Sequence, residues 1–144
     1  MALDLTAVEL PIVPSPDAAP FWSAVERGEL VLPSCATCGP FWYPRILCPA
    51  CGRREISWTA ASGRGAIHAF CIHHHSALPH LRPLLPVVSV LVELEEGPRM
   101  MGLLDAEPDP AVVTCGMKVE VDLRTTGGPT RALVFVPTLQ RRDP

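Results

Sequence analysis

The sequence has little positive charge. Its 144 residues include 12 Lys and Arg residues against 15 Asp and Glu residues, for a formal net charge of -3. Only one of the basic residues, Lys118, is a lysine. Proteins that bind nucleic acids usually carry an excess of basic residues on one face. The composition therefore does not favour that class, although it leaves room for a local basic patch.

The sequence also lacks the segments that direct a chain to a membrane. No apolar run reaches the roughly 20 residues that a bilayer-spanning helix needs. The N-terminal stretch MALDLTAVELPIVP has neither the basic start nor the long apolar core of a signal peptide. We therefore expect a cytoplasmic protein without a membrane partner, in a compartment where disulfides are disfavoured.

No complete catalytic motif occurs in the sequence. It has no Gly-x-Ser-x-Gly nucleophile elbow, and no glycine-rich phosphate-binding loop precedes a helix. Cys71 and Cys115 are isolated, and single cysteines are usually small, buried apolar residues. The sequence thus predicts that the chain is not an enzyme and that it has no catalytic residues of its own.

Proline is abundant, with 17 residues, and 48% of the sequence is hydrophobic. Proline interrupts helices, so long helices are not expected, while the apolar content is sufficient for a core. Residues 1–16 show no clear periodicity and predict a flexible N-terminal arm. A short helix is expected to begin at Asp17 as its N-cap and to end at Gly28.

The second half of the sequence predicts strands. Residues 87–94 form its most apolar segment, and residues 117–123 alternate strictly between apolar and polar side chains. Several short strands separated by turns are typical of a small closed barrel, of which the OB-fold is the commonest type. We predict a mainly β protein, in which an N-terminal helix and a four-Cys zinc ribbon occupy residues 17–54, a C-terminal five-stranded OB-fold barrel occupies residues 55–138, and a tail occupies residues 139–144.

Four of the six cysteines lie in two Cys-x-x-Cys-Gly motifs, CATCG and CPACG. Each motif brings two thiolates together on one tight turn, and the following glycine can take a positive φ angle. Zinc prefers four such ligands in a tetrahedron. The sequence therefore predicts a metal site formed by Cys35, Cys38, Cys48 and Cys51.

Three alternatives to zinc remain at this stage. The first is that the cysteines are merely buried thiols, but two matched motifs make that a poor explanation. The second is a redox Cys-x-x-Cys, which normally stands alone at the start of a helix in an alternating strand–helix context, whereas this sequence has two such motifs. Iron stays open, because a tetrahedral four-sulfur site accepts either metal. Full thiolate coordination leaves no open position, so the site is expected to be structural and not catalytic.

Phe41, Trp42 and Tyr43 lie in a row between the two cysteine motifs. At least one of them is expected to pack the ribbon against the helix and the barrel. All three cannot be buried on so small an element, so the exposed remainder predicts an apolar contact surface for a partner.

His73, His74 and His75 form a second unusual run. On a strand, His73 and His75 share one face and His74 points away. No His-x-x-x-His or His-x-Glu motif accompanies them, so an exposed strand end is expected, ahead of a site-lining role or a metal site.

Arg45, Arg64 and Arg99 lie near predicted turns. Arginine side chains suit phosphate groups. Surface ion pairs with nearby carboxylates are nevertheless the favoured interpretation here.

The order of these parts resembles a known family, the OB-fold, acyl-CoA-associated proteins with an N-terminal rubredoxin-like zinc ribbon, formerly a domain of unknown function. The resemblance covers residues 17 to 138. Besides the cysteine motifs, the matching segments are Phe21-Trp22, Gly28-Glu29-Leu30, Pro44-Arg45, Trp58, Ser62-Gly63-Arg64-Gly65, 92–97, Gly116-Met117-x-Val119 and Pro137. Many ribbons share the cysteine pattern, but the Ser-Gly-Arg-Gly and Gly-Met-x-Val segments in this order are more specific. The histidine run is not recognised as a family feature.

The resemblance implies a non-catalytic accessory subunit. Such proteins assemble with thiolase-like enzymes, including thiolases and steroid side-chain aldolases, and help to form the acyl-CoA site. It implies a hetero-oligomer with a thiolase-like lyase or acyltransferase, a structural Zn²⁺ ion, and acyl-CoA shared with the partner. Two alternatives are a single-stranded nucleic-acid-binding protein, which the acidic composition disfavours, and a rubredoxin-like electron carrier containing iron.

Overall fold

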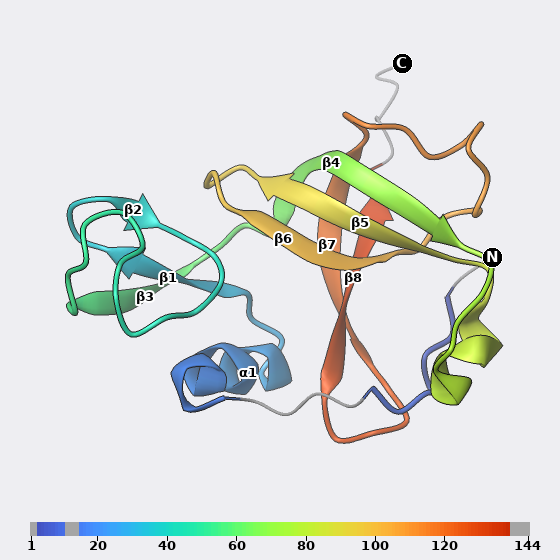
Figure 1. Cartoon of the computed structure of the whole chain (residues 1–144), viewed down its shortest axis with the longest axis horizontal. Helices are drawn as coiled ribbons and strands as arrows, with labels where there is room; N and C mark the ends of the chain where they lie inside the picture. Colours follow the sequence, from blue (N-terminus) through green and yellow to red (C-terminus); the bar gives the residue numbers. More distant parts are fainter. Residues whose placement is uncertain (1–2, 11–14, 139–144) are drawn as a thin grey trace, which may run out of the picture.

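The computed structural model describes residues 3–10 and 15–138. Figure 1 shows a small sheet on one side of the molecule and a barrel on the other, with a short helix beside the small sheet. This confirms a mainly β fold that consists of a helix, a four-cysteine ribbon and a barrel.

The barrel is closed by five strands in the order β4-β5-β6-β8-β7, as predicted. They are β4 (Arg64–His73), β5 (Val87–Leu94), β6 (Arg99–Leu104), β7 (Lys118–Thr125) and β8 (Arg131–Pro137). The β6–β8 pair is parallel and the other pairs are antiparallel. Alternate residues of β5 face inward, so Val88, Val90 and Val92 are buried in the barrel core.

The small sheet has the order β2-β1-β3, with β1 (Val31–Cys35) between β2 (Gly39–Pro40) and β3 (Ile56–Ala60). We expected residues 55–60 to belong to the barrel segment. Instead, all five residues of β3 are in register with β1, from Val31 opposite Ala60 to Cys35 opposite Ile56. A local strand pattern cannot identify the partner strand, because pairing depends on residues distant in the sequence.

Helix α1 (Ala19–Glu26) follows a single 3₁₀ turn, η1 (Pro16–Ala18). The N-cap prediction for Asp17 is wrong: this residue lies inside the 3₁₀ turn, and Ala18 occupies the N-cap position without a side-chain hydrogen bond. The predicted end is confirmed, because Gly28 has a φ angle of 80° and its N–H donates to the Val25 carbonyl at 3.0 Å. Among the described residues, none of the helices has both the length and the apolar character that crossing a bilayer requires.

The described part of the N-terminal arm packs against the barrel. Leu5 and Val8 are buried beside Val87, Ala132 and Val134. The Gly127 N–H donates to the carbonyls of Leu5 (3.2 Å) and Val8 (2.8 Å). The expectation of a flexible arm is therefore wrong for residues 3–10, because their apolar side chains have a surface to cover. Residues 1–2 and 11–14 of this arm and the predicted tail 139–144 lie outside the described residues.

The connection between β4 and β5 contains a second 3₁₀ helix, η2 (Pro79–Leu84). Leu84 of this helix is buried, and Leu81 and Leu85 pack beside it on the outer face of the barrel. The arm and η2 together therefore form a second, smaller hydrophobic cluster outside the barrel core.

Candidate metal centre and its surroundings

The four predicted metal ligands come together at one end of the small sheet. The Sγ atoms of Cys35, Cys38, Cys48 and Cys51 all lie within 4.8 Å of one another, and those of Cys35 and Cys51 are 3.7 Å apart. A tetrahedral ion with Zn–S bonds of about 2.3 Å needs sulfurs about 3.8 Å apart. The geometry and the chemistry of the donor set therefore fit a four-thiolate metal ion.

The two Cys-x-x-Cys turns are shaped by the glycines that follow them. Gly39 and Gly52 have φ angles of 84° and 73°, which L side chains rarely adopt. At the second turn, the Gly52 N–H donates to the Cys48 carbonyl at 2.9 Å. The predicted positive φ angles are thus confirmed, and they allow backbone amides to face the sulfurs.

Those amides change the acidity of the thiols. Hydrogen bonds to the sulfur from the backbone N–H groups of Cys51 and Ala50 lower the pKa of Cys48 to about 7 against the effect of burial. The pKa of Cys35 is lowered chiefly by the backbone N–H of Cys38. The hydrogen bond with Cys51 raises the pKa of Cys38 to about 12. Because the thiolate is the metal-binding form, the turns prepare two of the four ligands for an ion.

The aromatic run between the motifs joins the ribbon to helix α1. Phe41 is buried, and the Trp42 ring packs against Phe21 of α1 with a centroid distance of 4.7 Å. Tyr43 is 51% exposed, which confirms that the three aromatic residues are not all buried. Ile46 (61% exposed) and Leu47 (37%) are further exposed apolar residues of the same loop, and we call Tyr43, Ile46 and Leu47 the ribbon tip.

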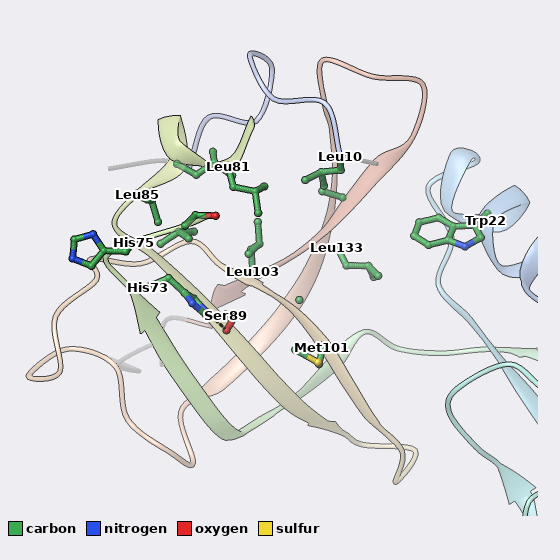
Figure 2. A pocket seen from close by; sticks show the side chains of 15 residues that line it. Leu10, Trp22, His73, His75, Leu81, Leu85, Ser89, Met101, Leu103 and Leu133 are labelled. Carbon is green, nitrogen blue, oxygen red and sulfur yellow. Dashed lines mark hydrogen bonds between the residues drawn. The ribbon is translucent and has the colours of Figure 1, made fainter. Parts of the chain in front are cut away.

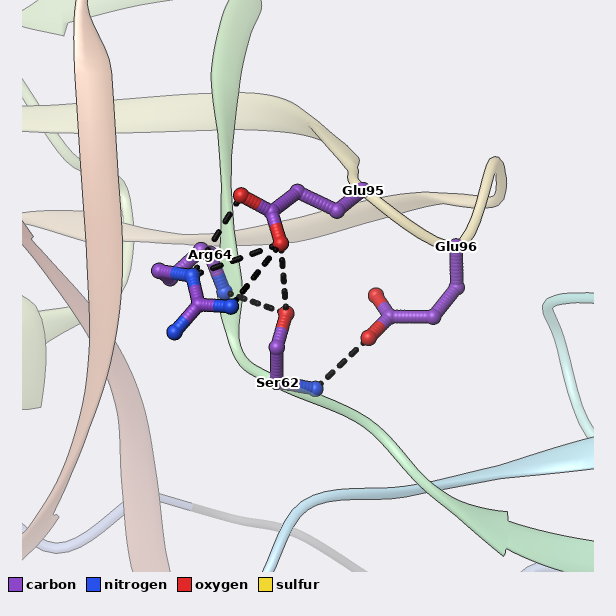
Figure 3. Close-up of polar contacts among 4 residues, drawn as sticks. All are labelled: Ser62, Arg64, Glu95 and Glu96. Atoms are coloured by element: carbon purple, nitrogen blue, oxygen red, sulfur yellow. Dashed lines mark hydrogen bonds and ion pairs between the residues drawn. The ribbon is translucent and has the colours of Figure 1, made fainter.

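A group of polar contacts ties the linker between β3 and β4 to the turn after β5 (Figure 3). The Ser62 N–H donates to Glu96 Oε1 at 2.6 Å. Arg64 pairs with Glu95 at 3.2 Å and donates its backbone N–H to Ser62 Oγ. The Arg64 guanidinium lowers the pKa of Glu95. We call Ser62, Arg64, Glu95 and Glu96 the polar clasp. Their contacts hold the linker between the ribbon and the barrel against the β5–β6 hairpin.

The favoured interpretation of the three arginines is confirmed for two of them. Arg64 pairs with Glu95 as part of the polar clasp, and Arg99 pairs with Glu93 at 3.0 Å. Arg45 is exposed and forms no ion pair with any residue that the structure describes.

The histidines and the isolated cysteines lie away from the metal centre. His73 and His75 both line a groove on the barrel, although only His73 lies on a strand, because β4 ends there. His73 Nε2 lies 2.7 Å from Ser89 Oγ. Cys71 and Cys115 are exposed, so the expectation of burial is wrong. For Cys71 the reason is register: it pairs with Ser89, whose side chain lies on the outside of the barrel.

The groove residues from the N-terminal arm, from η2 and from β6 were not identified from the sequence. Leu10, Leu81 and Leu103 are ordinary apolar residues with no motif around them. The one available signal was the alternation of side chains along residues 87–94. It places Ser89 on the opposite face of the strand from the inward-facing Val88 and Val90.

A helix, a four-cysteine ribbon and a closed five-stranded barrel, in this order, define a protein that combines a rubredoxin-like ribbon with an OB-fold. Residues 22–57 match the family described as ChsH2, rubredoxin-like zinc ribbon domain, and residues 58–124 match ChsH2, C-terminal OB-fold domain. The chain belongs to this family, the ChsH2 or DUF35 family. The predicted resemblance is thereby confirmed.

Relatives of known sequence include scaffold proteins and hydratase subunits. The chain is 32% identical to a DUF35 domain-containing scaffold protein of Methanothermobacter thermautotrophicus, over 69% of this chain and 74% of that protein. It is 39% identical to the 3-oxo-4,17-pregnadiene-20-carboxyl-CoA hydratase alpha subunit of Mycobacterium tuberculosis, over 73% of this chain. The chain spans 33% of that subunit and 38% of a probable enoyl-CoA hydratase alpha subunit of Thermomonospora curvata.

A solved structure shares the whole arrangement. A chain of the Ltp2-ChsH2(DUF35) aldolase superposes with a TM-score of 0.76 at 30% identity, covering 88% of this chain and 98% of that one. A DUF35-family protein of unknown function from Sulfolobus solfataricus, at 15% identity and a TM-score of 0.60, shares the fold.

Proposed function

We propose that the chain is a non-catalytic accessory subunit that binds a thiolase-fold acyl-CoA enzyme in the cytoplasm and helps to form its acyl-CoA site. The observation that carries this proposal is the similarity to a chain of the Ltp2-ChsH2(DUF35) aldolase, over 98% of that chain's length. The partner would be a steroid side-chain aldolase or a thiolase. The name of the archaeal scaffold relative supports a role in assembly.

The ribbon tip supports this proposal, because it offers a rigid apolar surface. Tyr43 and Ile46 are more than half exposed, yet their loop is anchored by Trp42 against the buried Phe21 of α1. Exposed aromatic and aliphatic side chains on a fixed backbone lose little conformational entropy on binding. In the proposed complex, the ribbon tip is the part of this chain that the partner enzyme covers.

The metal ion gives that surface its rigidity. Cys35, Cys38, Cys48 and Cys51 would hold one Zn²⁺ ion with no open coordination position, so the ion would be structural. Metal binding contributes directly to the folding free energy of small ribbons. The ion would therefore keep the loop between the two cysteine motifs, and with it the ribbon tip, in one conformation.

The test is capture of the partner from the native host with the tagged chain, followed by mass spectrometry. We expect a thiolase-like subunit in a stable complex. Tyr43→Asp and Ile46→Asp should abolish capture while metal content and thermal stability stay unchanged. Val112→Asp is the matched control. Val112 is 45% exposed on the loop between β6 and β7 of the barrel, so this substitution should not affect capture. Turnover of an acyl-CoA substrate by the isolated chain would contradict the proposal.

Loss of a metal ligand is the second test. Cys48→Ser should lower the metal content measured by elemental analysis and should abolish capture of the partner, because the ribbon loses its fold. Full capture by a metal-free variant would show that the ion does not support the docking surface.

Iron remains a second candidate metal, because the four-sulfur donor set fits either ion. A rubredoxin-like electron carrier would be red, with visible absorption bands from iron–thiolate bonds. The zinc form that we propose would be colourless, so one absorption spectrum of native protein separates the two.

A further inference from the structure

A groove of about 380 Å³ crosses the outer face of the barrel, and neither the four metal-site cysteines nor the ribbon-tip residues line it (Figure 2). Figure 2 shows Trp22 of α1 at one end and His75 at the other, with Leu103 and Ser89 between them. The β5 side chains that reach the groove, Val87 and Ser89, alternate with valines that face the barrel core. The side of β5 that borders the groove is therefore the outer face of the barrel.

This face corresponds to the one that OB-folds use for binding. The groove lies over β5 and β6, which are the second and third strands of the barrel in chain order. OB-folds bind their ligands on the face of strands two and three, flanked by the loop between strands one and two. Here that loop is the β4–β5 connection, which contributes His75, Leu81 and Leu85 to the groove.

The lining excludes the ligands that OB-folds commonly bind. None of the described residues that line the groove is Lys, Arg, Asp or Glu, and most of them are apolar, including leucines from the arm, η2, β6 and β8. A nucleic-acid backbone or a nucleotide phosphate requires cationic side chains. Single strands also require a row of aromatic platforms, whereas Trp22, at the groove's end, is the one Phe, Tyr or Trp residue among the described residues of this lining. The lining instead suits an uncharged apolar molecule, and the volume lies within the range of about 300–1,000 Å³ that is typical of small-molecule sites.

Four of the lining residues are polar: His73, His75, Ser76 and Ser89. Ser76 Oγ is engaged with the backbone of Leu78, whereas His73 and Ser89 pair with each other. His73 Nε2 and Ser89 Oγ are 2.7 Å apart, and both residues line the groove. A serine hydroxyl is both a donor and an acceptor. If His73 donates to Ser89, the serine O–H is free to donate to a ligand carbonyl. If Ser89 donates to His73, the serine oxygen can accept from a ligand hydroxyl. The pair therefore matches a single carbonyl or hydroxyl oxygen on an otherwise apolar molecule.

We propose that this groove binds an uncharged, apolar small molecule with one carbonyl or hydroxyl oxygen, which hydrogen-bonds to the His73–Ser89 pair. The inference goes beyond the proposed subunit role, because it concerns a site complete within this chain and does not require a partner enzyme. A charged group such as a coenzyme A nucleotide would stay outside the groove.

The test uses the purified metal-loaded chain and the hydrocarbon probe 1,6-diphenylhexatriene, which fluoresces in apolar sites. We expect saturable binding that 2-decanone and decane both displace. Ser89→Ala should weaken displacement by 2-decanone about three- to tenfold, as expected for one neutral hydrogen bond. Decane should be unaffected by this substitution, because it has no oxygen.

A second variant tests the location. Met101 is 66% exposed at the groove, so Met101→Glu should leave the fold unchanged. It should weaken probe binding at least about tenfold, because the bound probe would cover and desolvate the carboxylate. Val112→Glu is the control on an exposed residue outside the groove, and should bind the probe as the wild type does.

Three results would overturn the inference: no saturable binding to the wild-type chain, unchanged binding to Met101→Glu, or equal effects of Ser89→Ala on decane and 2-decanone. Loss of partner capture in Met101→Glu, with no probe binding by the wild type, would show that the groove is a protein interface. Capture through the ribbon tip is measured separately, so failure of this inference and failure of the proposed function give different results.

Discussion

Replacing Phe21 by alanine tests how helix α1 is fixed to the ribbon. Phe21 is 1% exposed, and its ring lies 5.0 Å from that of Trp22 and 4.7 Å from that of Trp42. Truncating a buried phenylalanine typically costs about 3–5 kcal/mol, which includes the cavity left behind. Because domains of this kind have unfolding free energies of about 5–15 kcal/mol, Phe21→Ala should remove a large part of the stability.

Urea unfolding followed by tryptophan fluorescence measures this loss, because Trp22 and Trp42 both contact the deleted ring. The midpoint should fall while the slope of the free energy against urea stays constant. Phe21→Leu retains most of the apolar volume and should cost less than about 1.5 kcal/mol. Val112→Ala, on the exposed barrel loop, should be neutral. A Phe21→Ala loss of less than about 1 kcal/mol would refute the packing argument, since the cavity term alone should exceed it.

Two further predictions concern polar contacts. Arg124 pairs with Asp105 at 2.8 Å and donates to the Leu3 carbonyl at 3.2 Å, so Arg124→Met should destabilise the chain by about 1–3 kcal/mol and speed hydrogen exchange at the Leu3 amide. Unchanged exchange at Leu3 would show that Arg124 does not hold the arm. The hydrogen bond from Arg64 lowers the pKa of Glu95 in the folded protein. The pair therefore stabilises the fold fully at a pH above the unfolded-state pKa of Glu95. This stabilisation is lost as the pH falls through the lower, folded-state pKa. Glu95→Gln should therefore lower the unfolding midpoint at neutral pH, and the difference from wild type should vanish in acid; a difference that persists in acid would mean that the charge is not its cause.

The parts of the fold that depend on short segments were predictable. The two Cys-x-x-Cys-Gly motifs specify their own turns, because the cysteine spacing and the positive φ of Gly39 and Gly52 are local properties. The barrel strands followed from alternation, as in residues 117–123, which lie almost wholly in β7. The burial of Cys71 was predicted wrongly, because the face of the sheet on which a side chain lies depends on strand register as well as on residue type.

Features that depend on distant contacts were not predictable in this way. The pairing of β3 with β1 depends on hydrogen bonds between residues more than twenty positions apart. Leu5 and Val8 are buried because the barrel and η2 present apolar side chains to them. The groove combines residues from the arm, α1, the β4–β5 connection and the barrel, and no single segment carries its pattern.

The sequence by itself determined the number and spacing of the sulfur ligands, the turns around them and the strands that can form a barrel, because each of these depends on neighbouring residues. Only the tertiary structure decided which strand completes the ribbon sheet, where the N-terminal arm lies and which apolar side chains remain uncovered beside His73 and Ser89. The physical reason is that burial and strand pairing are properties of two surfaces in contact. Local sequence patterns indicate which surfaces are apolar, but they do not specify which of these surfaces come into contact.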